Sequence, residues 1–155
     1  MNAQPITGGC QCGAVRYRVK ALGYASICHC RMCQKAFGNY FAPLVKVEGF
    51  EWTRGERKLF ASSNLTSRGF CADCGTPLTL ETRGEIEVAI ATLDDPSAVS
   101  PECHVNLNDR VPAVKHWDKI PEASDERRED NDKWNATIVS YQHPDHDTAE
   151  WKVRK

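Results

Sequence analysis

The chain has 155 residues, of which 41% are hydrophobic and 26% charged, which is the composition of one ordinary globular domain. Its formal net charge of -1 provides no broad attraction to phosphate backbones or anionic membranes, so we expect neither nucleic acid nor a membrane as partner. The sequence lacks a run of roughly 18 apolar residues and a basic-then-apolar N-terminus. We therefore expect a cytoplasmic protein.

The first half of the chain predicts a series of short strands. Polar and apolar residues alternate over Val15–Lys20, and Tyr24–Cys28 is the next candidate. Aromatic and β-branched residues are frequent over Tyr40–Trp52, which glycine and proline divide, and a turn signal then precedes Lys58–Ala61. These segments indicate a protein built from strands.

The middle of the chain predicts a hairpin and one short helix. The hairpin has Phe70–Glu81 and Ile86–Leu93 as its arms, joined through residues 82–85. The helix is predicted over Cys33–Phe37, where Gly38 ends it after little more than one turn. The fold class that follows is all-β.

The composition changes near residue 121. Residues 122–133 are too polar to bury, which predicts a solvated helix face or a mobile segment. Beyond them, 134–141 is apolar enough to predict one more strand, and Trp151 is a candidate anchor for the C-terminus. We expect a zinc-binding domain over 1–121 and a polar extension over 122–155 that packs in part on it.

Cysteine is the most informative residue type in this sequence. A reducing compartment keeps thiols free, so closely spaced cysteines favour metal binding, with a disulfide framework as the alternative. Seven of the eight cysteines form three clusters, each with the spacing that lets one turn present two sulfurs to a zinc ion. The clusters are Cys10 and Cys12, then Cys28, Cys30 and Cys33, then Cys71 and Cys74.

The two outer pairs predict one closed structural site. Gly13 and Gly75 follow the second cysteine of each pair, which permits the turn that directs amide groups toward sulfur. Four thiolates complete a tetrahedral zinc sphere. Because the pairs lie far apart in the sequence, we expect folding to depend on this metal.

The middle cluster supplies only three sulfurs and predicts a second, more open zinc site. A fourth position left to water or substrate is where chemistry takes place. Alternatively, His29, Cys103 or His104 completes a second closed site. A simpler reading makes Cys103 an ordinary buried core residue, and a surface position is the simplest reading for His143 and its neighbour His146.

The joint pattern of the three clusters resembles the glutathione-dependent formaldehyde-activating enzyme (Gfa) family, also called the centromere-protein-V/Gfa family. The flanks are similar too, from Gly8-Gly9 before the first pair to Arg68-Gly69-Phe70 before the last pair. The later stretch from His104 to Pro121 also matches, although 104–110 only loosely follows the family's aromatic-rich stretch. The resemblance covers roughly residues 6 to 121.

The resemblance implies an all-β, Mss4-like arrangement of coiled sheets stapled by two zinc ions. It implies a structural site from the outer pairs and a catalytic site at Cys28, Cys30 and Cys33. The associated reaction is the reversible addition of glutathione, as co-substrate, to formaldehyde, which is a carbon–sulfur lyase type of activity. Zinc can deprotonate a thiol or polarise the carbonyl oxygen, and both roles remain open here.

Two alternative functions compete with the lyase. The first is a non-catalytic zinc module that binds a thiol compound or a protein partner. The second is chromatin or nucleic-acid binding, which would require a concentrated basic face. Candidate contacts for the carboxylates of glutathione are the cations near the motifs, namely Arg31, Lys35, Lys46 and Arg68, with solvated surface charge as the simpler reading for each.

Overall fold

The computed structural model describes residues 5–154 and is mostly β-sheet, which confirms the predicted fold class. Within that range the strands form a three-stranded sheet of order β1-β2-β5 and a seven-stranded sheet of order β10-β3-β4-β9-β8-β7-β6. Neighbouring strands are antiparallel except for β10 and β3, which are parallel. The strands are β1 (Ile6–Gly9), β2 (Arg16–Val19), β3 (Ala21–Cys28), β4 (Ala42–Glu48), β5 (Glu51–Arg54), β6 (Lys58–Ala61), β7 (Thr66–Phe70), β8 (Pro77–Thr82), β9 (Glu85–Ala89) and β10 (Cys103–Val105).

The main hydrophobic core is organised around Tyr17 of β2, whose side chain is fully buried. Its ring stacks on Phe50 at 5.4 Å between centroids and meets Trp52 edge-on at 6.2 Å. Its hydroxyl lies 2.8 Å from the Thr92 hydroxyl, which provides the partner that a buried phenol requires. The alternating pattern of the strand predicted over Val15–Lys20 therefore places this tyrosine inside, as the pleat of a strand dictates.

Most of the predicted strands are present with small shifts at their ends. The hairpin is confirmed as β8 and β9, with Arg83 and Gly84 in left-handed conformation at the turn. The residues before β8 were predicted to continue its strand, but from Cys71 to Thr76 they form a tight turn instead. The strand pattern of the sequence is overridden there because this segment turns to bring two cysteines together.

The predicted short helix is α1 (Arg31–Phe37), which starts two residues earlier than expected. Cys30 caps it, since its sulfur accepts a hydrogen bond from the Cys33 backbone amide. Gly38 ends it in left-handed conformation with φ 56°, as the sequence indicated. Two of the three clustered cysteines are thus fixed by the first turn of one helix.

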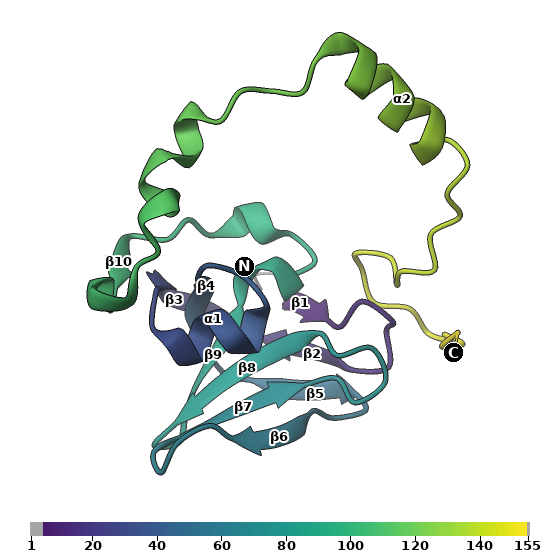
Figure 1. Cartoon of the computed structure of the whole chain (residues 1–155). Coiled ribbons are helices and arrows are strands. Elements are labelled where there is room, and N and C mark those ends of the chain that lie inside the picture. The colour runs from purple at the N-terminus through teal and green to yellow at the C-terminus, as the bar shows by residue number, and fades with distance from the viewer. Residues whose placement is uncertain (1–4, 155) are drawn as a thin grey trace.

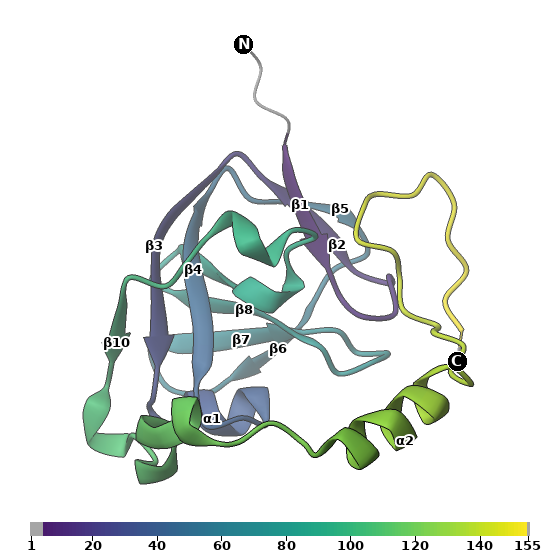
Figure 2. The ribbon, with the colours of Figure 1, turned by 90° about the horizontal axis from the view of Figure 1, so that it is seen from above.

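The second half of the described chain contains little sheet. Short 3-10 segments occur at Ile90–Thr92, Pro96–Ala98, Leu107–Asp109 and Pro112–Lys119, and they precede α2 (Asp125–Asn135). Figure 1 and Figure 2 show that α2 and the chain on either side of it, which we call the arch, stand away from the sheets. The chain then returns beside β1 and β2. Across residues 5–154, no helix has the length and apolar character needed to cross a membrane.

The arch corrects one prediction and confirms another. Residues 122–133 are exposed and largely helical, in agreement with the predicted solvated helix face. The predicted strand over 134–141 is wrong: Trp134 and Asn135 lie in α2, and residues 136–141 are exposed coil and turn. Apolar composition alone gave a wrong prediction here, because no neighbouring strand within residues 5–154 is available to pair with this segment.

Candidate metal centres

The two outer cysteine pairs meet at one place in the fold. The sulfurs of Cys10, Cys12, Cys71 and Cys74 all lie within 4.8 Å of one another. Cys12 Sγ is 3.6 Å from Cys10 Sγ and 3.8 Å from Cys71 Sγ. Zinc–sulfur bonds of about 2.3 Å in a tetrahedron place sulfurs about 3.8 Å apart, so the donor set fits a zinc ion.

Each pair is presented by a turn that ends in a left-handed glycine. Gly13 has φ 75° and donates to the Cys10 carbonyl at 3.1 Å, and Gly75 has φ 76° and donates to the Cys71 carbonyl at 2.9 Å. A further amide, that of Val15, lies 3.3 Å from Cys10 Sγ. These turns bring backbone donors toward the sulfurs, which favours the thiolate form.

Hydrogen bonding makes Cys74 an acidic thiol. Burial works to raise its pKa, but hydrogen bonds from Thr76 and Cys12 together outweigh burial and lower the pKa to about 6. Burial dominates at Cys71 and raises the pKa of that thiol to about 11. Cys74 therefore ionises before Cys71.

The middle cluster assembles where β3 ends and α1 begins. The sulfurs of Cys28, Cys30 and Cys33 also lie within 4.8 Å of one another, and no fourth His, Cys, Asp or Glu between residues 5 and 154 joins them. Cys28 is the last residue of β3, and its sulfur accepts a hydrogen bond of 3.1 Å from the Asn106 amide. Three thiols are one ligand short of a closed tetrahedron, which is the donor set of an open zinc site.

The three thiols share their charge unequally. A hydrogen bond from the Cys33 thiol, together with bonds from the Cys30 backbone and Asn106, lowers the pKa of Cys28 to about 5. The same contact raises the pKa of Cys33, and burial raises it further. Cys28 thus ionises before Cys33, and the thiolate is the form that binds a metal.

The candidates for a fourth ligand are engaged elsewhere. His29 is fully buried, and its Nε2 atom lies 2.9 Å from Nδ1 of His104. Cys103 Sγ lies 2.5 Å from the Tyr24 hydroxyl. The reading of Cys103 as a buried core residue is wrong, because β10 is the edge strand of its sheet and leaves this side chain half-buried.

A cavity of about 310 Å³ lies against the exposed side of α1, next to the middle cluster. Three of the four predicted cationic contacts, Arg31, Lys35 and Arg68, line it. The fourth, Lys46, is not among its lining residues and pairs with Glu85 at 2.7 Å. The remaining wall is formed by Met32, Ala36, Phe60 and Ser62.

The last part of the chain packs on the turn that holds Cys10 and Cys12. We call residues 143–151 the C-terminal clasp. His143 is only 3% exposed, donates its backbone amide to the Gln11 carbonyl at 2.8 Å, and packs its ring on Trp151. Trp151 donates to the Cys12 carbonyl at 2.8 Å, which confirms its predicted anchoring role. The surface reading of His143 is wrong, since long-range packing buries it.

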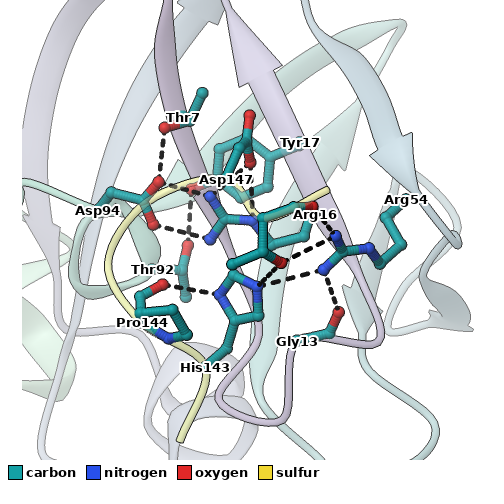
Figure 3. Close-up of polar contacts among 11 residues, drawn as sticks. Thr7, Gly13, Arg16, Tyr17, Arg54, Thr92, Asp94, His143, Pro144 and Asp147 are labelled. Atoms are coloured by element: carbon teal, nitrogen blue, oxygen red, sulfur yellow. Dashed lines mark hydrogen bonds and ion pairs between the residues drawn. The ribbon is translucent and has the colours of Figure 1, made fainter. Parts of the chain in front are cut away.

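An ion pair and hydrogen bonds hold the C-terminal clasp in place (Figure 3). The buried Arg16 guanidinium binds both carboxylate oxygens of Asp94, at 2.7 and 2.5 Å, and also reaches Asp147. Arg54 lies 3.2 Å from Nε2 of His143 and donates to the Gly13 carbonyl at 3.3 Å. The sequence contains these charges, but nothing in their spacing reveals that they meet.

The fold and its cysteines define a mostly-β protein with two separate clusters able to hold metal ions. Residues 5–109 match the family model described as glutathione-dependent formaldehyde-activating enzyme. The chain belongs to this family, as its cysteine pattern indicated.

A solved structure shares the fold. The crystal structure of a protein from Rhodobacter sphaeroides matches this chain with a TM-score of 0.51 and 24% sequence identity. The match covers 64% of this chain and 99% of that chain. At this level of identity the likeness concerns the fold alone, and it includes nearly all of the other protein.

Proposed function

We propose that this protein is a zinc-dependent carbon–sulfur lyase that forms and breaks S-hydroxymethylglutathione. The observation that carries the proposal is the three-sulfur cluster beside a cavity lined by three cations. Family membership supports glutathione and formaldehyde as the chemistry. The proposed ligands are Cys28, Cys30 and Cys33 for the catalytic zinc, and the other four clustered cysteines for a structural zinc.

In the forward direction, the glutathione sulfur attacks the formaldehyde carbon, a C–S bond forms as the C=O π bond breaks, and the oxygen takes up the proton that the thiol has lost. A zinc ion, when bound, supplies Lewis acidity and favours the thiolate form of a bound thiol. The protein's own residues hold charge around it: Asn106 donates to Cys28, and the backbone of Cys33 donates to Cys30. The cations of the cavity attract the carboxylates of glutathione.

The deciding experiment compares metal content with glutathione binding. We expect two zinc ions per chain by mass spectrometry and glutathione binding by calorimetry that disappears after chelation. Formaldehyde should then be consumed in a glutathione-dependent assay with the zinc-loaded protein. Cys30→Ser should remove one zinc ion and turnover. Cys103→Ser, which changes a cysteine outside both clusters, should retain two zinc ions and turnover.

Different failures point to different conclusions. One zinc ion per chain with no glutathione binding would contradict the lyase and leave a zinc-stabilised binding module. Two zinc ions with zinc-dependent glutathione binding but no consumption of formaldehyde would contradict the reaction while preserving the thiol site. A gel-shift titration at low salt tests nucleic-acid binding separately, and we expect no retardation.

A further inference from the structure

Arg68 stands out among the cations of the cavity because it is buried. It lies in the middle of β7, opposite Phe60 of β6 and Leu80 of β8, and only 8% of its surface is exposed. Arg31 and Lys35, by contrast, are exposed residues of α1. Burying a guanidinium is costly unless its donors are satisfied, so each nitrogen needs a partner.

Two of the three nitrogens of Arg68 have partners that fix the side chain. Nε donates to the Ser62 hydroxyl at 3.2 Å, and NH2 donates to Cys33 Sγ at 3.4 Å. The third, NH1, is buried and has no hydrogen-bond partner within the described part of the chain. One side of the guanidinium therefore supports a cysteine of the middle cluster, while a donor remains unused.

The cavity supplies the place for the missing partner. Arg68 and Ser62 both line it, and the side chains around them include Met32, which is 48% exposed. NH1 itself has almost no accessible surface, so a carboxylate reaches it when the side chains that line the cavity shift. There it would meet a charged donor that is shielded from water, where charge-assisted hydrogen bonds are strongest. A cation on a mobile surface side chain offers much less, because solvent screens it.

We propose that Arg68 is a specificity-determining residue that binds a carboxylate of the thiol substrate through NH1 while its NH2 group positions Cys33. The identification of that thiol as glutathione rests on the proposed function. The contact would link substrate binding to the metal cluster through one rigid group. Arg68 therefore differs from Arg31 and Lys35, which contribute only general positive charge at the cavity.

The test compares glutathione with its dialkyl ester, which lacks both carboxylates, in calorimetry on the zinc-loaded protein. The wild type should prefer the acid by about ten- to hundredfold, the range expected for one charge-assisted hydrogen bond. Arg68→Gln should bind acid and ester almost equally, and Arg68→Lys should recover part of the preference. Lys46→Gln is the matched control, since it removes a cation outside the cavity and should retain the wild-type preference.

A merely structural role for Arg68 would weaken acid and ester together and leave their ratio unchanged, which would overturn the proposal. Zinc content is measured on every variant, because losing the contact to Cys33 should also weaken zinc binding at the middle cluster by about tenfold. Arg68→Gln with wild-type acid preference overturns the Arg68 contact but preserves the lyase proposal.

If the wild type binds no glutathione, the proposed function fails and Arg68 is tested with acetate alone. Acetate titrated into the cobalt-substituted protein should perturb the cobalt–thiolate absorption of the wild type and Lys46→Gln, and not that of Arg68→Gln. Equal responses in all three proteins, or none in the wild type, would overturn the carboxylate contact.

Discussion

Cysteines occur in three different environments in this protein, and the groups around each sulfur decide its role. Cys74 and Cys28 each receive hydrogen bonds that lower their pKa to about 6 and about 5. Cys103 lies in neither cluster and contacts only a tyrosine hydroxyl among the polar groups described. Ligand chemistry thus depends on donors arranged around sulfur as well as on the spacing of the cysteines.

Serine substitutions should separate the two clusters. Cys30→Ser keeps the helix cap, because serine is a favourable N-cap, so we expect loss of one zinc ion with a fold that still unfolds cooperatively. Cys74→Ser removes a ligand from the site that joins the first and third clusters, and we expect loss of cooperative unfolding. Circular dichroism with metal analysis measures both outcomes. Equal destabilisation by the two substitutions would contradict this division.

His143 should make the stability of the protein depend on pH. Burial lowers its pKa below the ordinary 6.5, and the positive charges of Arg16 and Arg54 lower it further. The unfolded chain therefore binds a proton more readily than the folded one, so this contribution is complete above pH 6.5 and is lost as the pH falls below it. Protonation would also place a donor against Arg54, since Nε2 accepts there when Nδ1 donates to the Pro144 carbonyl.

A comparison with His143→Gln isolates this effect from protonation of the metal ligands, which both proteins share. At pH 7.5 we expect the substitution to lower the free energy of unfolding by about 1–3 kcal/mol. The difference between the two proteins should narrow between pH 6.5 and pH 5, as measured by denaturant unfolding. A difference that stays constant over this range would show that His143 remains neutral or contributes through packing alone.

At the scale of elements, the two cysteine turns look alike in sequence but differ in what covers them. Gly13 and Gly75 have nearly the same φ, 75° and 76°. A Cβ on Gly13 would lie 2.3 Å from the His143 ring, whereas one on Gly75 would have no atom within 4 Å among those described. The C-terminal clasp therefore makes the first turn part of the interior and leaves the third cluster's turn open.

Alanine at these two glycines should measure the packing of the C-terminal clasp. Gly75→Ala carries only the strain of a left-handed residue, about 1–2 kcal/mol. Gly13→Ala carries the same strain plus displacement of His143, for which we expect about 1–3 kcal/mol more. Chemical denaturation of the zinc-loaded proteins gives both values, and the excess should vanish when residues 141–155 are deleted. An excess that survives the deletion would place its origin elsewhere.

The sequence predicts elements well where the signal is local. Alternation indicated β2, the turn residues indicated the β8–β9 hairpin, and cysteine spacing with glycine indicated the two turns that bring the outer cysteine pairs together. The failures are long-range: the apolar stretch after Trp134 has no strand to pair with, and His143 is buried only because the chain returns to the Cys10 turn. The cavity cations were proposed by proximity to the motifs; three of the four line one cavity, but proximity could not distinguish the buried Arg68 from the exposed two, and their contact with a carboxylate stays a prediction.

At the scale of the whole molecule, the described chain combines a sheet structure whose cysteine clusters can hold metal ions with an exposed arch. The first and third cysteine clusters are 59 residues apart between Cys12 and Cys71, so a metal there constrains a long stretch of chain. The arch carries no buried residue along α2. We therefore expect the arch to open at a much lower free energy than the sheets.

Limited digestion with trypsin, with and without chelator, tests this division. Arg127 and Arg128 on α2 are exposed and not packed on the core, so cleavage there should proceed at the same rate whether or not zinc is bound. Arg16 and Arg68 are buried within the sheets, and cleavage after them requires opening of the metal-stapled part. Mass spectrometry should find α2 cut first in the zinc-loaded protein, and sheet cleavages only after chelation. Protection of α2 that depends on zinc would contradict an arch that is independent of the sheets, and would indicate that it packs on them in solution.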